Sequence, residues 1–104
     1  MAQAIGMISV YGLAAAFAAL DAGCKAAAVT AEPFDKNKPA HADSLPVPLI
    51  VLIKFRGTVE DVKAAVEAAA EAAGRVTSVI TQSIIANPSE GAEKMMKISA
   101  LDKN

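Results

Sequence analysis

Hydrophobic positions along the chain repeat with the period of a β-strand in several places. Residues 4–10 place Ile5 and Met7 on one face and Ile8 and Val10 on the other, which predicts a strand with both faces partly buried. Residues 49–55 form a nearly continuous apolar run, typical of a central strand. Residues 28–34 and the β-branched segment 76–86 complete a set of four predicted strands.

A helical period begins after the first strand. Leu13, Phe17, Leu20 and Cys24 follow one another at intervals of four, three and four positions, which predicts a helix over residues 13–27 with this stripe in the core. On this interpretation Cys24 is a packing residue, and replacing Phe17 with Ala would cost about 3–5 kcal/mol. The alternative for Cys24, a metal or cluster ligand shared around a symmetry axis, stays open.

A second helix is bounded by signals at both ends. Thr58 is suited to the N-cap, and Gly74 to the C′ position that follows a helix. Its apolar stripe recurs at intervals of three and four positions and consists of Val59, Val62, Val66, Ala69 and Ala73. Ser89 is expected to cap a short terminal helix that runs to Met96.

The predicted order is strand, helix, strand, strand, helix, strand. This is the ferredoxin-like α/β (α+β) arrangement, an antiparallel sheet with the two helices on one face. We expect a single domain over residues 1–104, with its core at about 4–93 and a tail at 97–104. Residues 35–48 are polar and hold three prolines, which predicts a long loop.

Composition points to self-association. The chain has 104 residues, of which 54% are hydrophobic, and a mean hydropathy of +0.38, so a monomer would leave apolar surface exposed. The net charge of −1 offers no basic surface for nucleic acid or membrane. The apolar N-terminal stretch lacks a basic start and is interrupted by Gly6, Gly12 and Asp21, so we expect a cytoplasmic protein without a signal peptide.

Candidate chemistry is sparse. The one cysteine and the one histidine, His41, are not arranged with any partner at metal-ligand spacing, and no paired carboxylates or phosphate-binding loop are present. We therefore expect no catalytic residue, no metal site and no cofactor, and an enzyme is disfavoured.

Four segments, taken in order, resemble the bacterial microcompartment (BMC) shell domain. They are residues 6–8 (GMI), 11–13 (YGL), 21–27 (DAGCKAA) and 56–65 (RGTVEDVKAA), and the correspondence covers about residues 4–93. The resemblance implies the same fold, a homo-hexameric ring, and tiling with other shell proteins around metabolic enzymes. The alternative to a closed hexamer is a ring that fails to close and gives a helical or other open assembly.

The resemblance also assigns positions to functional residues. Lys25 matches the family's hexamer-edge lysine with Asp21 beside it, and Asn87 stands where the family usually has an Arg at the same edge. The pore-region loop would carry Lys36, Asn37, Lys38, Pro39 and His41. Its lysines either form a positive ring around the pore or are ordinary solvated loop residues, and its length predicts a narrowed or displaced pore.

A different class of function remains as the alternative. Small ferredoxin-like rings also serve as regulatory ligand-binding proteins, with a long loop at the subunit interface. Tiling requires Lys25 to face outward, whereas a ligand sensor requires polar groups that converge in the cleft between subunits.

Overall fold

The predicted order of elements is confirmed. The computed structural model describes residues 3–37 and 49–96. Along the chain lie β1 (Ala4–Tyr11), α1 (Leu13–Ala26), β2 (Thr30–Asn37), β3 (Ile50–Gly57), α2 (Val59–Gly74), β4 (Val79–Ile85) and α3 (Glu90–Met96). Four strands and two long helices therefore occupy the places that the hydrophobic pattern assigns to them.

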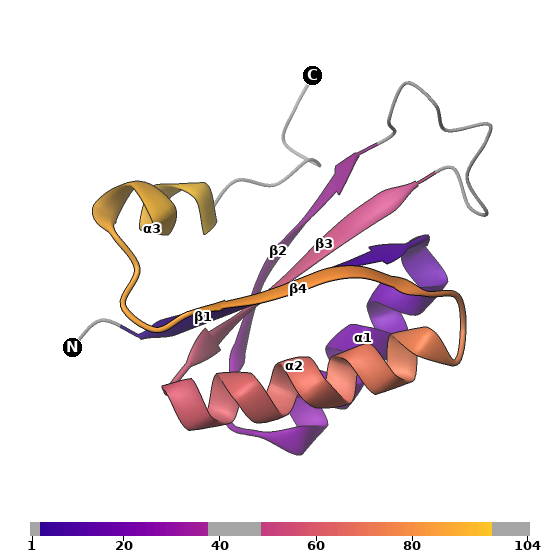
Figure 1. The fold of residues 1–104 in the computed structure, drawn as a ribbon, viewed down its shortest axis with the longest axis horizontal. Coiled ribbons are helices and arrows are strands. Elements are labelled where there is room, and N and C mark those ends of the chain that lie inside the picture. The colour runs from indigo at the N-terminus through magenta and orange to yellow at the C-terminus, as the bar shows by residue number, and fades with distance from the viewer. Residues whose placement is uncertain (1–2, 38–48, 97–104) are drawn as a thin grey trace.

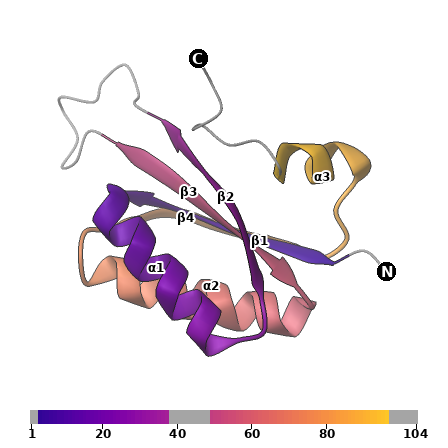
Figure 2. The ribbon, with the colours of Figure 1, turned by 180° about the vertical axis from the view of Figure 1, so that it is seen from behind.

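The strands form one antiparallel sheet in the order β2-β3-β1-β4. Helices α1 and α2 lie side by side on one face of this sheet, and the short α3 lies on the opposite face (Figures 1 and 2). This is the ferredoxin-like arrangement expected from the sequence. It leaves β2 and β4 as the two edges of the sheet. Within residues 3–37 and 49–96, α3 is the one helix on the face opposite α1 and α2.

The core between the sheet and the helices is built from small side chains. Helix α1 buries Ala15, Ala16, Ala19 and Gly23, and α2 buries two valines, Val62 and Val66, with three alanines. Such residues let the two helices lie close to the sheet and to each other. A Cβ atom on Gly6 would approach Val66 Cγ2 to 2.7 Å, so this strand position accepts no side chain under α2.

A glycine joins β1 directly to α1. Gly12 has a φ of 84°, a conformation that residues with a Cβ rarely adopt. Its amide donates to the Leu49 carbonyl at 2.8 Å, and its carbonyl accepts from Ala16 at the start of the helix. One residue thus turns the chain from strand to helix.

The predicted core stripe of α1 is wrong. Phe17 is 59% exposed and Leu13 is 43% exposed, Cys24 is also exposed, and Leu20 is half-buried. The alanine and glycine face packs inward instead, because the close approach of α1 leaves no room for larger side chains. Within one subunit, Phe17→Ala is therefore not expected to cost about 3–5 kcal/mol. Cys24 is not a core packing residue there.

The helix caps are partly as predicted. Thr58 Oγ1 accepts from the Asp61 amide at 3.1 Å, and Ser89 Oγ accepts from the Ala92 amide at 3.2 Å, which confirms both N-caps. Gly74, however, is the last residue of α2 and has no positive φ, so it is not a C′ glycine. Arg75 follows as the C-cap, and its amide donates to the carbonyls of Ala72 and Ala73.

The predicted loop at 35–48 begins too early. Strand β2 continues to Asn37 and pairs Asp35, Lys36 and Asn37 with residues of β3. Polar residues are tolerated in this position because an edge strand needs only its backbone to pair. Residues 38–48 lie outside the described part of the chain.

Candidate functional site

The β4 edge exposes apolar side chains that extend the core. By register, Ile84 lies opposite Gly6 and therefore on the face covered by α2. Ile84 is nevertheless 37% exposed, Ile80 is 38% exposed, and Val76 in the preceding turn is 49% exposed. We call Val76, Ile80 and Ile84 the β4 edge. Helix α2 does not reach far enough to cover it.

The opposite side of the subunit carries a second apolar surface. The rings of Phe17 on α1 and Phe34 on β2 are 5.5 Å apart at an angle of 56°, a favourable tilted arrangement. Leu13 lies one helical turn before Phe17 on the same face of α1. We call Leu13, Phe17 and Phe34 the α1–β2 edge. Leu13 and Phe17 are exposed and Phe34 is half-buried, and apolar side chains that gather at a surface in this way mark an interaction surface.

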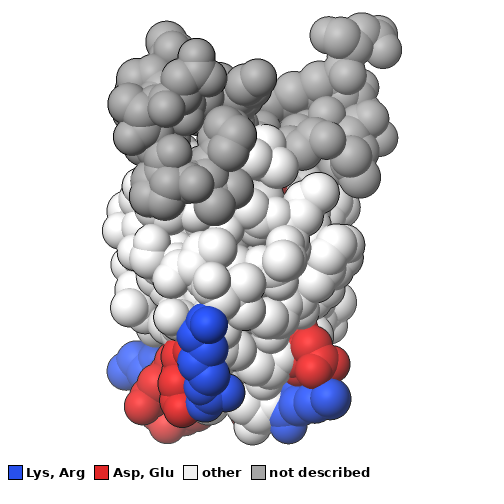
Figure 3. Space-filling model, turned by 90° about the vertical axis from the view of Figure 1, so that its right-hand side faces the viewer, with Lys and Arg blue, Asp and Glu red and all other residues white. Residues whose placement is uncertain are grey.

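Charged side chains are sparse at the end of the subunit where α2 turns into β4. Figure 3 shows this end, with charged residues gathered along its lower margin and almost all of the other described surface uncharged. The strand β4 itself, VITQSII, contains no charged residue. An uncharged edge strand presents unpaired backbone groups and apolar side chains together, which favours burial against another protein.

The predicted edge residues Asp21 and Lys25 form an ion pair on the outer surface of α1. Lys25 Nζ lies 2.9 Å from Asp21 Oδ2, and the side chains are 75% and 63% exposed for Lys25 and Asp21. The hydrogen bond and the charge of Asp21 raise the pKa of Lys25 above its usual value. The two side chains thus pair on an exposed surface, as the i, i+4 spacing predicts.

The other predicted site residues are placed differently. Asn87 is exposed in the turn between β4 and α3. Lys36 and Asn37 lie in β2, where their Cα atoms face Val51 and Ile50 of β3, and not in a loop. Lys38, Pro39 and His41 fall outside the described residues. Of the predicted site residues whose side chains are described, the structure brings together Asp21 and Lys25.

Sequence reasoning missed a clamp around Arg56. Its Nε donates to Glu32 of β2 at 2.9 Å, and its Nη1 donates to Glu93 of α3 at 2.7 Å. The Arg56 side chain is only 14% exposed. The hydrogen bond that it donates to the Glu93 carboxylate is the main reason that the pKa of Arg56 is raised further above its already high value. This clamp ties β2, β3 and α3 together on the face of the sheet away from α1 and α2.

Within residues 3–37 and 49–96, no group of three His, Cys, Asp or Glu side chains could hold a metal ion. None of the helices in the same part of the chain is long and apolar enough to cross a membrane.

Comparison with known proteins agrees with this fold. A family model described as the BMC domain matches residues 4–88. The chain is 35% identical over 105 residues to the carboxysome shell protein CcmK3 of Halothece sp., covering 99% of this chain and 94% of that protein. It is 39% identical over 100 residues to the carboxysome shell protein CcmK2 of Synechocystis sp., covering 94% and 88%.

A solved structure shows the same fold. A microcompartment protein from Desulfitobacterium hafniense superimposes with a TM-score of 0.71 at 17% identity. The match covers 90% of this chain and 48% of the solved chain, so this chain spans about half the length of that protein. With the family model and both relatives covering most of its length, the chain belongs to the BMC domain family of bacterial microcompartment shell proteins.

Proposed function

We propose that six copies of this chain close into a ring, and that the rings tile the shell of a carboxysome-type microcompartment. As a member of the BMC family the chain is a structural shell protein and not an enzyme, and it assembles with itself and with other shell proteins. The regulatory ligand-binding alternative is therefore set aside. The six-membered ring and the carboxysome are the parts of the proposal that need testing.

One observation supports the proposed ring: the two apolar surfaces, the β4 edge and the α1–β2 edge, lie on opposite sides of the sheet. The β4 edge is at one end of the strand order and the α1–β2 edge is at the other. Two different surfaces on opposite sides of a subunit support a head-to-tail contact, which repeats until the rotation closes a ring. In such a contact Phe17 of one copy would meet Ile84 of the next, and both side chains would leave water.

The other predicted site residues are assigned positions in this arrangement. Asp21, Lys25 and Asn87 would lie at the contacts between neighbouring rings, since all three are exposed and leave the two apolar edges free. The segment from Lys36 through Asn37, Lys38 and Pro39 to His41 would lie near the ring axis, as the family resemblance implies. The names of the curated relatives support the carboxysome as the compartment.

The test is the mass of the purified protein and of two edge variants. Native mass spectrometry and light scattering should give six copies for the unchanged chain. Ile84→Asp and Phe17→Asp each bury a carboxylate at every contact, at a cost of more than about 3 kcal/mol, so both should release monomers that keep their helical circular dichroism. Ala64→Asp, on the exposed outer surface of α2, is the matched control and should stay hexameric.

Other outcomes separate the parts of the proposal. A monomeric unchanged protein at micromolar concentration would refute the ring, and hexamers that survive both edge variants would show that the contact lies elsewhere. Lys25→Ala should leave hexamers intact while abolishing sheets or tubes in negative-stain micrographs. Sheets that persist in this variant would remove Lys25 from the contact between rings.

A further inference from the structure

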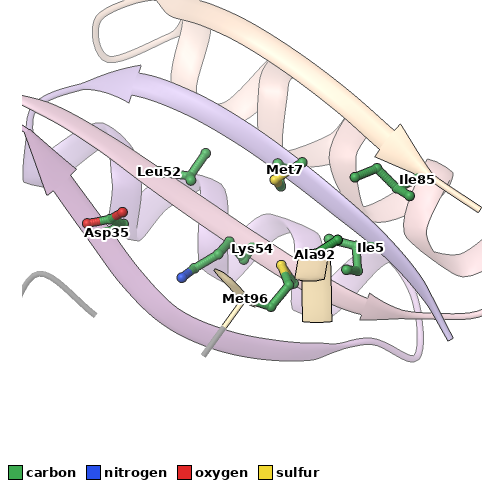
Figure 4. Close-up of a pocket in the computed structure, with 8 residues that line it drawn as sticks. All are labelled: Ile5, Met7, Asp35, Leu52, Lys54, Ile85, Ala92 and Met96. Atoms are coloured by element: carbon green, nitrogen blue, oxygen red, sulfur yellow. The ribbon is translucent and has the colours of Figure 1, made fainter. Parts of the chain in front are cut away.

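A cavity of about 300 Å³ separates the sheet from α3. Figure 4 shows its lining, which comes from all four strands and from α3. The apolar part consists of Ile5, Met7, Leu52, Ile85, Ala92 and Met96. Met96 is 2% exposed, so α3 is docked on the sheet and the space is part of the folded subunit. Apolar cavities of this size are where small molecules bind in proteins.

Two charged groups of opposite sign line the same cavity. Lys54, in the middle of β3, is 2% exposed, and Asp35 lies on the neighbouring strand β2. In Figure 4 the ammonium end of Lys54 extends from β3 toward the strand that carries Asp35. Both groups take part in interactions within the fold. An ammonium has three donors and a carboxylate about four acceptor sites, so each has capacity beyond a single partner.

The opposite charges of Lys54 and Asp35 determine which kind of ligand the cavity can bind. A ligand carboxylate would approach Asp35, and a ligand ammonium would approach Lys54, in an apolar space where an unpaired charge is costly. An uncharged hydroxyl fits both groups, because it accepts a hydrogen bond from the ammonium and donates one to the carboxylate. The apolar lining accommodates the aliphatic chain of such a ligand.

The volume of the cavity limits the length of the aliphatic chain. At roughly 30 Å³ for each water-sized group, 300 Å³ holds about ten non-hydrogen atoms. Ala92 contributes only a methyl group from α3, and a larger side chain at this position would occupy the space. The cavity therefore depends on the small residue that α3 presents to it.

We propose that the cavity between the sheet and α3 is a binding site for an uncharged aliphatic molecule of about ten non-hydrogen atoms with a hydroxyl at one end. The site lies within one subunit, so it does not depend on the ring or on the compartment proposed above. Lys54 and Asp35 orient the hydroxyl, and the methionine, leucine and isoleucine side chains bind the chain.

The experiment is calorimetric titration of the assembled protein with 1-heptanol, and in parallel with heptanoate and heptylammonium. We expect saturable binding of 1-heptanol and binding of the two charged probes at least about tenfold weaker. Ala92→Leu should abolish the 1-heptanol signal by filling the cavity, whereas Ala64→Leu on the outer surface of α2 should not. Lys54→Met should weaken 1-heptanol binding about tenfold, and the control Lys63→Met, at an exposed position, should leave it unchanged.

Each contrary result overturns a defined part of the proposal. The absence of saturable 1-heptanol binding up to its solubility limit, or equal binding by a folded Ala92→Leu protein, refutes the site. Heptanoate or heptylammonium that binds as well as 1-heptanol refutes the assignment of the hydroxyl. If Lys54→Met fails to fold, the comparison of the three probes on the unchanged protein still decides that assignment.

Discussion

Gly23 provides a sharp test of the close packing between α1 and the sheet. It lies on the buried face of α1, against the Phe55 ring of β3 and the backbone of α2. A Cβ atom in Gly23→Ala would stand 2.8 Å from Phe55 Cε1 and 3.2 Å from the Ala65 carbonyl oxygen, and nearer still to Phe55 Cζ. The aromatic ring is buried on all sides and cannot move away without disturbing the core.

The expected magnitude is the difference between two opposing effects. Alanine favours a helix over glycine by about 1 kcal/mol, and overpacking a core costs about 1–3 kcal/mol. Gly23→Ala should therefore lower the free energy of unfolding by up to about 2 kcal/mol. Gly74→Ala is the matched control, because no atom lies within 4 Å of the added Cβ, and it should raise stability by about 0.5–1 kcal/mol.

The assay is thermal unfolding followed by circular dichroism at one fixed protein concentration, since assembly also affects the midpoint. The two variants should differ by at least about 2 °C in Tm, given that 1 kcal/mol shifts the Tm of a domain of this size by about 4–8 °C. In a Phe55→Leu background the Gly23→Ala change should no longer be harmful. If Gly23→Ala stabilises the unchanged background as much as Gly74→Ala does, the reasoning about this contact is wrong.

Three further predictions concern the clamp, a helix cap and the surface ion pair. Arg56→Met removes both hydrogen bonds of the clamp, so the protection of the α3 amides in hydrogen exchange should fall about 10- to 100-fold. Unchanged exchange would mean that Met96 alone holds α3 on the sheet. Thr58→Ala should cost about 1 kcal/mol in urea unfolding, while Thr58→Ser should cost little. Because Asp21 raises the pKa of Lys25 in the folded chain, any stability from this pair is present at neutral pH and is lost as pH rises through the folded pKa. In an NMR titration Asp21→Asn should lower that pKa, and an equal value would show that the pair does not persist in solution.

The order of elements could be predicted from local patterns, whereas the buried face of α1 could not. The stripe of α2 and the Thr58 cap are signals within a few residues of one another. In α1, however, Leu13 and Phe17 and the set Ala15, Ala16 and Ala19 both follow helical spacing. Size favours burial of the larger set, yet the close approach of the helices to the sheet buries the smaller one.

The candidate site divides in the same way. The pair Asp21–Lys25 follows from an i, i+4 spacing and was predictable. The Arg56 clamp joins residues 24 and 37 positions apart, so it depends on the sheet order and on where α3 docks. The exposure of Ile80 and Ile84 likewise requires knowing that β4 is an edge strand, because the same alternation would suit a central one.

The two faces of the sheet carry different helices, so a layer assembled from these subunits would have two different surfaces. In the ring proposed above, cyclic symmetry gives every copy the same orientation, so sheets that lie in the plane of the wall would present α1 and α2 toward one side and α3 toward the other. A solute that arrives from the first side meets alanine-rich helices and their surface ion pairs. A solute that arrives from the second meets the Arg56 clamp and the cavity with Lys54 and Asp35. The two sides of such a layer therefore offer different chemistry to the solutes that reach them.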